Sequence, residues 1–173
     1  DFCLSRGLGD VYKRQAQAKL STTRAVTIVT RAFDDPRLGK THFEECERVS
    51  DRCNILRLRT DDARYLPKEE MDAQLPELTD AFLKALRQAT HLPDIIHAHF
   101  ADAAVLAEAA QREFGIPFLY TPHSLGLGKE GASTSEAMQA RIAQERNAIC
   151  KAAGIIVSSR DEAERQVEAY GCN

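Results

Sequence analysis

Short β-branched runs alternate with longer helical stretches from Ala16 onward, and this order restricts the fold more than any other feature of the sequence. Apolar residues recur at strand spacing in the short runs and at helical spacing in the long ones. An alternation of strands and helices is typical of right-handed crossovers on a parallel sheet, so an α/β fold is expected. Strands are predicted over 25–31, 54–59, 94–100, 116–121 and 154–158, and helices over 68–89, 101–114, 136–152 and 160–170.

Three of these segments carry a more specific expectation. The alternating pattern of 54–59 favours a strand nearer an edge of the sheet. Pro76 falls inside the helical pattern of 68–89, where a proline bends a helix or starts a new one. Gly115 is expected to end the helix that precedes it.

Composition and charge exclude several classes of protein. The chain has 173 residues, of which 43% are hydrophobic and 28% charged, which fits one globular domain. Lys and Arg number 23 against 26 Asp and Glu, without a basic block, so no nucleic-acid partner is expected. The longest apolar runs, 25–29 and 155–157, are too short to cross a bilayer, so neither a membrane partner nor a signal peptide is expected. Five cysteines without a CxxC pair suggest reduced thiols and a cytoplasmic location.

The segment 5–15, SRGLGDVYKRQ, has neither a strand nor a helix period. It resembles the translation of a transposase sequencing adapter. Residues 1–15 are therefore expected to be non-native, and 16–173 to form a domain cut at both ends. The glycine pair in this segment lacks the preceding strand and the third glycine of a dinucleotide-binding turn.

Polar side chains follow three of the predicted strands. In an open parallel sheet ligands bind outside the carboxyl ends of the strands, so these residues are expected to line one cleft. Their mixture of cationic and carboxylate groups suits a phosphorylated polyol. They are His97, His99 and Asp102, then His123, Ser124 and Lys129, and then Ser158, Ser159 and Arg160.

The order and spacing of several motifs resemble the amino-terminal half of sucrose-phosphate synthases and related retaining glycosyltransferases. The resemblance covers nearly all of 25–170. The motifs are Tyr65-Leu-Pro-Lys-Glu69, His97-Ala-His-Phe-Ala-Asp-Ala-Ala104, Gly115-Ile-Pro, Thr121-Pro-His-Ser-Leu-Gly126 with Lys129, Arg141-Ile-Ala-Gln-Glu145, and Ser158-Ser-Arg-Asp-Glu162 with Gln166 and Tyr170.

The resemblance implies a GT-B glycosyltransferase with two Rossmann-like domains, of which this chain is an incomplete amino-terminal, acceptor-binding half. Such an enzyme transfers glucose from a nucleotide sugar, UDP-glucose or similar, to fructose 6-phosphate. The donor is bound mainly by the carboxyl-terminal domain, so no cofactor is expected in this domain and the chain alone is expected to be inactive. The family's first strand is central, so the sheet should be interrupted between 25–31 and 94–100.

Site roles also follow from the resemblance. His123 would contact the donor sugar near the reacting carbon, and Asp102 would hold hydroxyl groups of the acceptor. Cationic side chains would hold the acceptor's phosphate through charge-assisted hydrogen bonds. These cations are Lys68, Lys129, Arg141 and, as an additional candidate, Arg146.

Structural interpretations stand beside these roles. Asp102 suits the amino-terminal turn of a helix, and Arg141 and Arg146 suit an exposed, ion-paired helix face together with Glu145. His97 and His99 are two residues apart, a spacing that suggests zinc, yet no third ligand follows at a suitable distance. One of the two is therefore expected to be structural and the other to line the cleft, and no metal site is expected.

Three residues depart from the family's pattern and leave the acceptor open. Pro122 replaces a glycine that is usual in the family, Phe100 replaces a tyrosine and Ala104 replaces a glycine. The side chain of Ala104 is expected to fill space beside the acceptor. A sucrose-synthase-like enzyme, another retaining glycosyltransferase with a different acceptor, and a non-catalytic module that binds sugar phosphates remain as alternatives.

Overall fold

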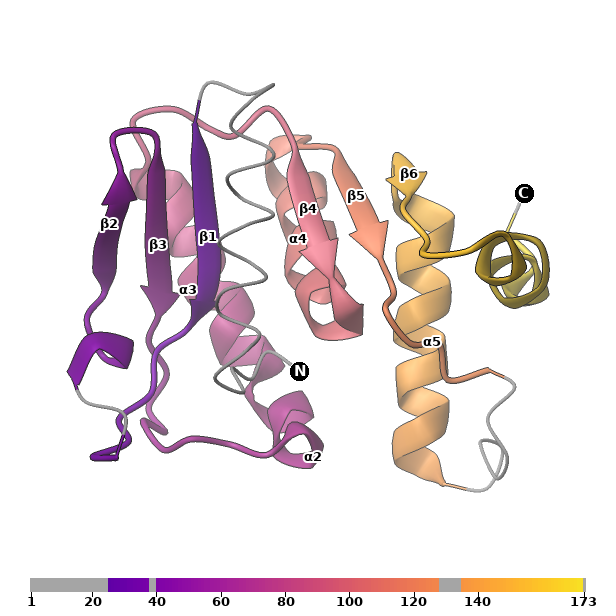
Figure 1. Cartoon of the computed structure of the whole chain (residues 1–173), viewed down its shortest axis with the longest axis horizontal. Coiled ribbons are helices and arrows are strands. Elements are labelled where there is room, and N and C mark those ends of the chain that lie inside the picture. Colours follow the sequence, from indigo (N-terminus) through magenta and orange to yellow (C-terminus); the bar gives the residue numbers. More distant parts are fainter. Residues whose placement is uncertain (1–24, 38–39, 128–134, 173) are drawn as a thin grey trace. The chain divides into compact units, whose positions relative to one another are not determined.

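The computed structural model describes residues 25–37, 40–127 and 135–172, with the side chains of 68 and 69 excepted, and it divides into two compact units. The adapter-like segment lies outside the described residues, so its origin stays a prediction. The first unit holds β1 (Val26–Arg31), η1 (Lys40–His42), β2 (Cys46–Ser50), β3 (Cys53–Leu58), α2 (Lys68–Met71) and η2 (Asp72–Gln74), and α3 (Leu75–Gln88) crosses the division at 82/83. The second unit holds β4 (Ile96–His99), α4 (Phe100–Phe114), β5 (Phe118–Thr121), α5 (Glu136–Lys151), β6 (Gly154–Ile155), the π-helical η3 (Glu162–Val167) and η4 (Glu168–Tyr170) (Figure 1).

The sheet of the first unit has the order β1-β3-β2. β1 runs parallel to β3, with Val26 opposite Cys53, and β2 runs antiparallel to β3. β3 is therefore central, and the prediction that it lies nearer an edge was wrong. The error comes from β2, which the sequence did not predict, because the strand Cys46–Ser50 is polar and alternates between exposed and half-buried residues.

The sheet of the second unit has the order β4-β5-β6, and all its pairs are parallel. Ile96 lies opposite Phe118, His99 opposite Thr121, and Tyr120 opposite Ile155. The α/β class with a parallel sheet is thereby confirmed. β6 is shorter than the predicted strand 154–158.

Within the described ranges β1 pairs with β3 and β4 pairs with β5, and no ladder joins β1 to β4. The predicted interruption of hydrogen bonding between these two strands is confirmed for those ranges. Each sheet has its own register and is held by its own ladder.

The helix boundaries follow from capping chemistry. The pattern of 68–89 is divided into α2, η2 and α3, and Pro76 occupies the first turn of α3, as predicted. Gly115 ends α4 with φ 72°, and its N–H donates to the carbonyl oxygen of Gln111 at 2.9 Å. Ser135 begins α5, since its hydroxyl accepts a hydrogen bond from the N–H of Met138.

The core of the second unit lies between the sheet, α4 and α5. Small side chains on α4 let the helix approach its neighbours closely. Ala104 is fully buried here, so it packs in the core and does not fill space beside an acceptor. The buried cluster consists of Ala98, Ala104, Ala107, Phe118, Tyr120, Leu125, Ala148, Ile149 and Tyr170.

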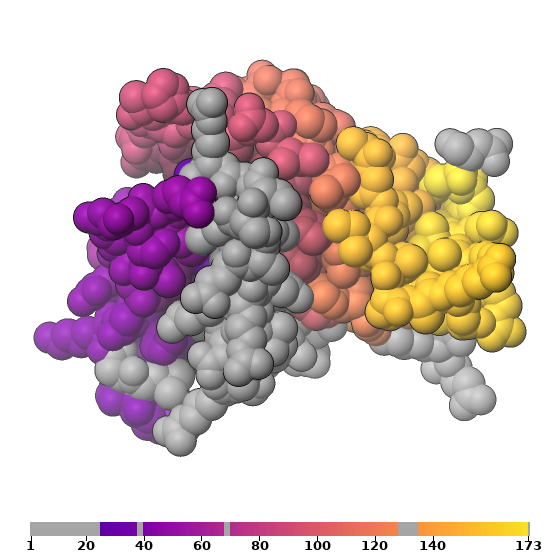
Figure 2. All heavy atoms as spheres, turned by 45° about the horizontal axis from the view of Figure 1, so that its top comes forward, coloured from indigo at the N-terminus to yellow at the C-terminus, as the bar shows by residue number. Residues whose placement is uncertain are grey.

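A disulfide joins Cys150, at the end of α5, to Cys172, with a Cα–Cα distance of 5.1 Å. Figure 2 shows α5 and the segment after it as one continuous surface, coloured light orange to yellow. The prediction that all cysteines are reduced thiols was wrong for this pair, which no sequence motif marks, whereas Cys46 and Cys53 are free. No helix in the described ranges is long and apolar enough to cross a membrane.

Candidate functional site

Three imidazoles meet at the carboxyl ends of β4 and β5. His99 is the last residue of β4 and is paired in register with Thr121, the last residue of β5. Nε2 of His97 lies 2.7 Å from Oγ1 of Thr121, and Nδ1 of His99 lies 2.8 Å from Nε2 of His123. We call His97, His99, Phe100, Thr121 and His123 the histidine cluster. It lies at the edge of the sheet where ligands bind in this class of fold.

The rings of the cluster stack on one another. The ring centroids of His97 and His99 are 4.1 Å apart, and those of His99 and His123 are 5.1 Å apart with an angle of 24° between the planes. Phe100 packs on His123 at 4.5 Å. The His123 ring is therefore held from two sides, by a strand residue and by the first residue of α4.

Phe100 and His123 also share an unusual backbone conformation. Their φ angles are 68° and 58°, and within the described ranges they are the two residues other than glycine with a positive φ. Such a conformation costs of order 1–3 kcal/mol per residue and is found most often at functional sites. The buried Pro122 fixes the backbone directly before His123.

The loop that follows His123 is held by a buried carboxylate. Glu145 of α5 is fully buried, and its Oε2 accepts a hydrogen bond from the N–H of Gly126 at 2.8 Å. The same carboxylate accepts hydrogen bonds from Nε of Arg141, at 2.8 Å, and from the hydroxyl of Tyr170. We call Arg141, Glu145 and Tyr170 the Glu145 anchor.

The other two members of the anchor also bond to the loop directly. Nη2 of Arg141 donates to the carbonyl oxygen of Ser124 at 2.8 Å, and the Tyr170 hydroxyl accepts from the N–H of Leu127 at 3.0 Å. Burial and the hydrogen bond to Glu145 raise the pKa of Tyr170, so this hydroxyl stays protonated and donates. The loop 122–127 is thus fixed to α5 and η4 by three hydrogen bonds, which involve Ser124, Gly126 and Leu127.

The interpretation of Arg141, Glu145 and Arg146 as one exposed ion-paired face was right about the ion pair between Arg141 and Glu145 and wrong about its exposure. The side chain of Glu145 is 1% exposed and that of Arg141 18%. Arg146 is exposed, and five residues of α-helix place it about 140° around the axis from Arg141. Periodicity could have separated the two arginines, but no local signal marks Glu145 as buried.

The remaining predicted site residues occupy different places. Asp102 is half-buried in the first turn of α4, two residues after Phe100. Lys68 is the first residue of α2 in the first unit, and its side chain is not among those described. Lys129 lies outside the described residues. The structure therefore brings His123 together with His99 and Phe100. Arg141 instead belongs to the Glu145 anchor.

The environment of His123 favours its neutral form. Burial lowers the pKa of the imidazole, and the Glu162 carboxylate opposes this shift in part. Oε2 of Glu162 accepts hydrogen bonds from the N–H and the hydroxyl of Ser158, both at 2.7 Å, and Ser159 Oγ accepts from the Glu162 N–H. These contacts close the turn after β6, where Arg160 pairs with Glu164.

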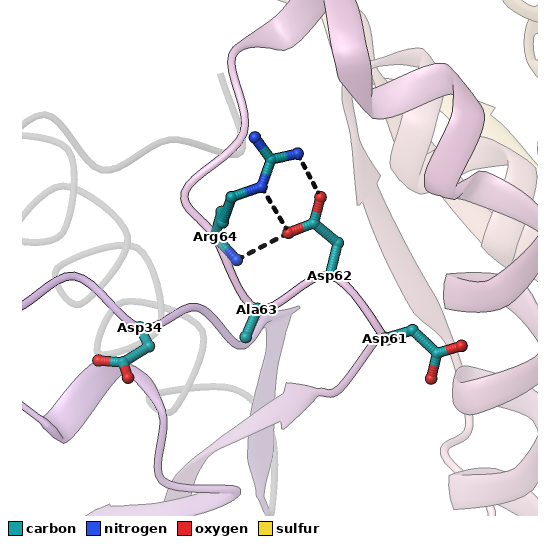
Figure 3. Close-up of a pocket in the computed structure, with 5 residues that line it drawn as sticks. All are labelled: Asp34, Asp61, Asp62, Ala63 and Arg64. Atoms are coloured by element: carbon teal, nitrogen blue, oxygen red, sulfur yellow. Dashed lines mark hydrogen bonds and ion pairs between the residues drawn. The ribbon is translucent and has the colours of Figure 1, made fainter.

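A hollow of about 630 Å³ opens in the first unit, at the carboxyl ends of β1 and β3. Nη2 of Arg64 lies 2.7 Å from Oδ2 of Asp62, and this guanidinium holds the pKa of that carboxyl below its ordinary value. Figure 3 shows the carboxylates of Asp34 and Asp61 pointing away from this pair. Carboxylates accept hydrogen bonds from hydroxyl groups and repel phosphate, so the lining suits a polyol better than an anion. Ala63 completes the lining.

Within the part of the chain that is described, no three His, Cys, Asp or Glu side chains are grouped as ligands for a metal ion. The stacked imidazoles, with Nδ1 of His99 hydrogen-bonded to Nε2 of His123, offer further hydrogen bonds and a polarisable surface. This chemistry suits contact with a sugar.

Replacing Gly126 with alanine is expected to lower the free energy of unfolding by about 1–3 kcal/mol. A Cβ at this position would lie 3.2 Å from Oε2 of Glu145, 3.2 Å from Cγ1 of Ile142 and 3.1 Å from Sδ of Met138. The Glu145 oxygen is held by Tyr170 and cannot retreat without losing the anchor. Urea unfolding monitored by circular dichroism measures the change.

Gly154→Ala is the matched control for that substitution. Its Cβ would meet the flexible end of the Leu119 side chain at 3.2 Å. We expect a smaller loss of stability than for Gly126→Ala. Equal losses for the two variants would show that contact with the anchor is not what makes position 126 restrictive.

A parallel α/β unit with polar rings at its strand ends defines a class of proteins that bind ligands at that edge of the sheet. The chain belongs to the glycosyl transferase 4-like domain family, which it matches over residues 6–173. It is therefore a member of a glycosyltransferase family, and the resemblance to sucrose-phosphate synthases is confirmed by the relatives below.

Three curated relatives illustrate the range of the family. Mannosylfructose-phosphate synthase of Agrobacterium fabrum is 30% identical over 105 residues, which are 61% of this chain and 22% of the relative. Sucrose-phosphate synthase 4 of Arabidopsis thaliana is 25% identical over 90% of this chain and 18% of its own length. D-inositol 3-phosphate glycosyltransferase of Geodermatophilus obscurus is 29% identical over 62% of this chain and 25% of its own length. The chain thus spans a quarter or less of these relatives.

Solved structures support the same fold. Two structures of a sucrose-phosphate synthase from Thermosynechococcus elongatus match with TM-scores of 0.73 and 0.71. The first is 24% identical and is matched over 90% of this chain and 38% of its own. The second is 21% identical and is matched over 91% of this chain and 78% of its own. The α/β fold of this chain therefore matches part of the GT-B fold of sucrose-phosphate synthase.

Proposed function

We propose that this chain supplies the acceptor-binding part of a retaining hexosyltransferase that moves glucose from a nucleotide sugar, such as UDP-glucose, to fructose 6-phosphate. The observation that carries the proposal is the fixed His123 ring at the end of β5, in a chain of a glycosyltransferase family. The three relatives described above add support, since each of their names includes a phosphorylated sugar or polyol.

In the proposed reaction, positive charge develops on the anomeric carbon of the donor sugar as the nucleotide diphosphate departs. A neutral His123 can contact that sugar without repelling the developing charge, and a lowered pKa keeps it neutral. The stack of rings fixes its position before substrate arrives, which reduces the entropy cost of reaching the transition state. Asp102 in the first turn of α4 is assigned to acceptor hydroxyls.

The acceptor's phosphate is assigned to Lys68 and Lys129. Arg141 and Arg146 were predicted for the same role, but Nε and Nη2 of Arg141 already bond to Glu145 and Ser124. Its contribution in this proposal is to hold the loop that carries His123. Arg146 lies on another face of α5, so it is left out of the phosphate site.

A second acceptor deserves a test because one relative is a D-inositol 3-phosphate glycosyltransferase. Inositol phosphate and fructose 6-phosphate share a ring of hydroxyls and one phosphate, and both fit carboxylate and lysine partners. A sucrose-synthase-like enzyme would use unphosphorylated fructose as its acceptor. A non-catalytic module would bind a sugar phosphate, and the whole protein would transfer no sugar.

Calorimetric titration of the 173-residue chain with fructose 6-phosphate, inositol 3-phosphate and fructose tests the proposal. We expect fructose 6-phosphate to bind most tightly, and Lys129→Ala to weaken that binding roughly tenfold, since one charge-assisted hydrogen bond is worth about that factor. Lys84→Ala, at an exposed position on α3, is the control. The chain alone should form no sucrose phosphate from UDP-glucose, because it matches 38% of a sucrose-phosphate synthase structure.

The outcomes separate the candidates. Equal binding of fructose and fructose 6-phosphate would contradict a phosphate site. Tighter binding of inositol 3-phosphate would transfer the proposal to that acceptor. Sucrose phosphate formed by the purified chain would show that the catalytic groups are already complete in these 173 residues.

A further inference from the structure

One hydrogen bond links the imidazoles of His99 and His123, and it restricts where their protons can be. Nδ1 of His99 lies 2.8 Å from Nε2 of His123. A neutral imidazole has a hydrogen on one ring nitrogen and a lone pair on the other, whereas an imidazolium has a hydrogen on both. One of the two facing nitrogens must therefore carry a hydrogen and the other must not. Two imidazoliums cannot make this bond.

His99 is the more firmly placed partner. It ends strand β4, in register with Thr121, and its ring stacks on that of His97 at 4.1 Å. His97 is itself fixed, with Nε2 2.7 Å from the Thr121 hydroxyl. His123 belongs to a turn with a positive φ and takes its ring position from His99 and Phe100. The strand residue therefore directs the turn residue.

We propose that His99 is a positioning residue that occupies Nε2 of His123, couples the tautomer of His123 to its own, and leaves Nδ1 of His123 as the ring nitrogen available to a ligand. The importance of that nitrogen for the reaction rests on the proposed function, in which His123 contacts the donor sugar. The coupling of the two tautomers does not depend on it, because the hydrogen bond exists in the chain without substrate.

The same bond couples the protonation of the two rings. The first proton is shared by the pair, and the second must break the bond because both facing nitrogens then carry hydrogens. Among the described residues, His97 on β4 stacks on His99, and Glu162 on η3 has a carboxylate that favours the charged form of His123. Asp102 follows His99 by three residues, in the first turn of α4. Each ring is therefore expected to sense two titration steps.

Long-range ¹H–¹⁵N NMR of the labelled 173-residue chain, between about pH 5 and 8, measures both properties. In the wild type we expect the same tautomer in excess on both rings, because the facing nitrogens must be one donor and one acceptor. His99→Asn keeps an amide group near the position of Nδ1, so Nε2 of His123 should stay hydrogen-bonded while the titration becomes a single step. His99→Gln places its amide near Nε2 instead, so the tautomer ratio of His123 should differ from that of the wild type.

His97→Gln is the control, because its amide replaces the Nε2 that bonds to Thr121 and leaves the His99–His123 bond intact. Different tautomers in excess on His99 and His123 in the wild type, or the same His123 tautomer ratio in the wild type and His99→Gln, would overturn the proposal. If His99→Gln does not fold, the number of titration steps decides. One step for His123 in His99→Asn and two in the wild type would support the proposal, and equal numbers would overturn it. Failure of fructose 6-phosphate to bind, with these NMR results intact, would count against the proposed function alone.

Discussion

Replacing Arg141 with methionine is expected to lower the free energy of unfolding by about 3–5 kcal/mol. The side chain of Glu145 is 1% exposed and loses its cationic partner in this variant, while the N–H of Gly126 and the Tyr170 hydroxyl remain. A buried carboxylate without a counter-charge is strongly destabilising, and methionine keeps the apolar stem of arginine, so the loss reports the charge. Urea unfolding gives the free energy directly.

Arg146→Met is the matched control, since this arginine is exposed five residues further along the same helix. We expect it to change stability by about 0.5 kcal/mol or less. Replacing Arg141 and Glu145 together with methionine and leucine should recover part of the loss, because no buried charge remains. A stable Arg141→Met chain that no longer binds fructose 6-phosphate would instead assign Arg141 to the phosphate, as the sequence predicted.

Breaking the disulfide between Cys150 and Cys172 is expected to lower the free energy of unfolding by about 3 kcal/mol. The two cysteines are 22 residues apart, so the bond closes a loop of that size and lowers the conformational entropy of the unfolded chain. The loss should be seen in Cys150→Ser with Cys172→Ser, and also in the wild type after reduction. Urea unfolding with and without a phosphine reductant measures both.

Two comparisons make this test specific to the bond. The double serine variant should not respond to the reductant, and Cys46→Ser, at an exposed free cysteine, should unfold like the wild type. Coincident unfolding curves of the oxidised and reduced wild type would show that the bond does not contribute to stability in solution.

The order of the elements could be predicted from the sequence because apolar periodicity is a local property. Gly115 and Pro76 end and begin helices for reasons that concern only a few neighbouring residues. β2 was missed because the strand Cys46–Ser50 is held by its ladder with β3 and has no buried face of its own. β3 was taken for a strand nearer an edge because its sequence alternates, and β2 in fact pairs with that edge.

The site was predictable in position but not in its contacts. The rule that ligands bind at strand ends selected His99 and His123, yet the hydrogen bond between them depends on the register of β4 with β5. The burial of Glu145 depends on Tyr170, which is 25 residues further along the chain. The pairing of Cys150 with Cys172 likewise arises from the way the last segment returns to α5.

The two residues with positive φ have a consequence for how this domain can change. Glycine at position 100 or 123 would relieve backbone strain, but it would also remove a ring that holds the cluster together. Mutations selected only for heat resistance would thus be drawn to the two positions where the proposed site needs an aromatic ring. Improvement of this protein for use at high temperature is better sought away from these two positions.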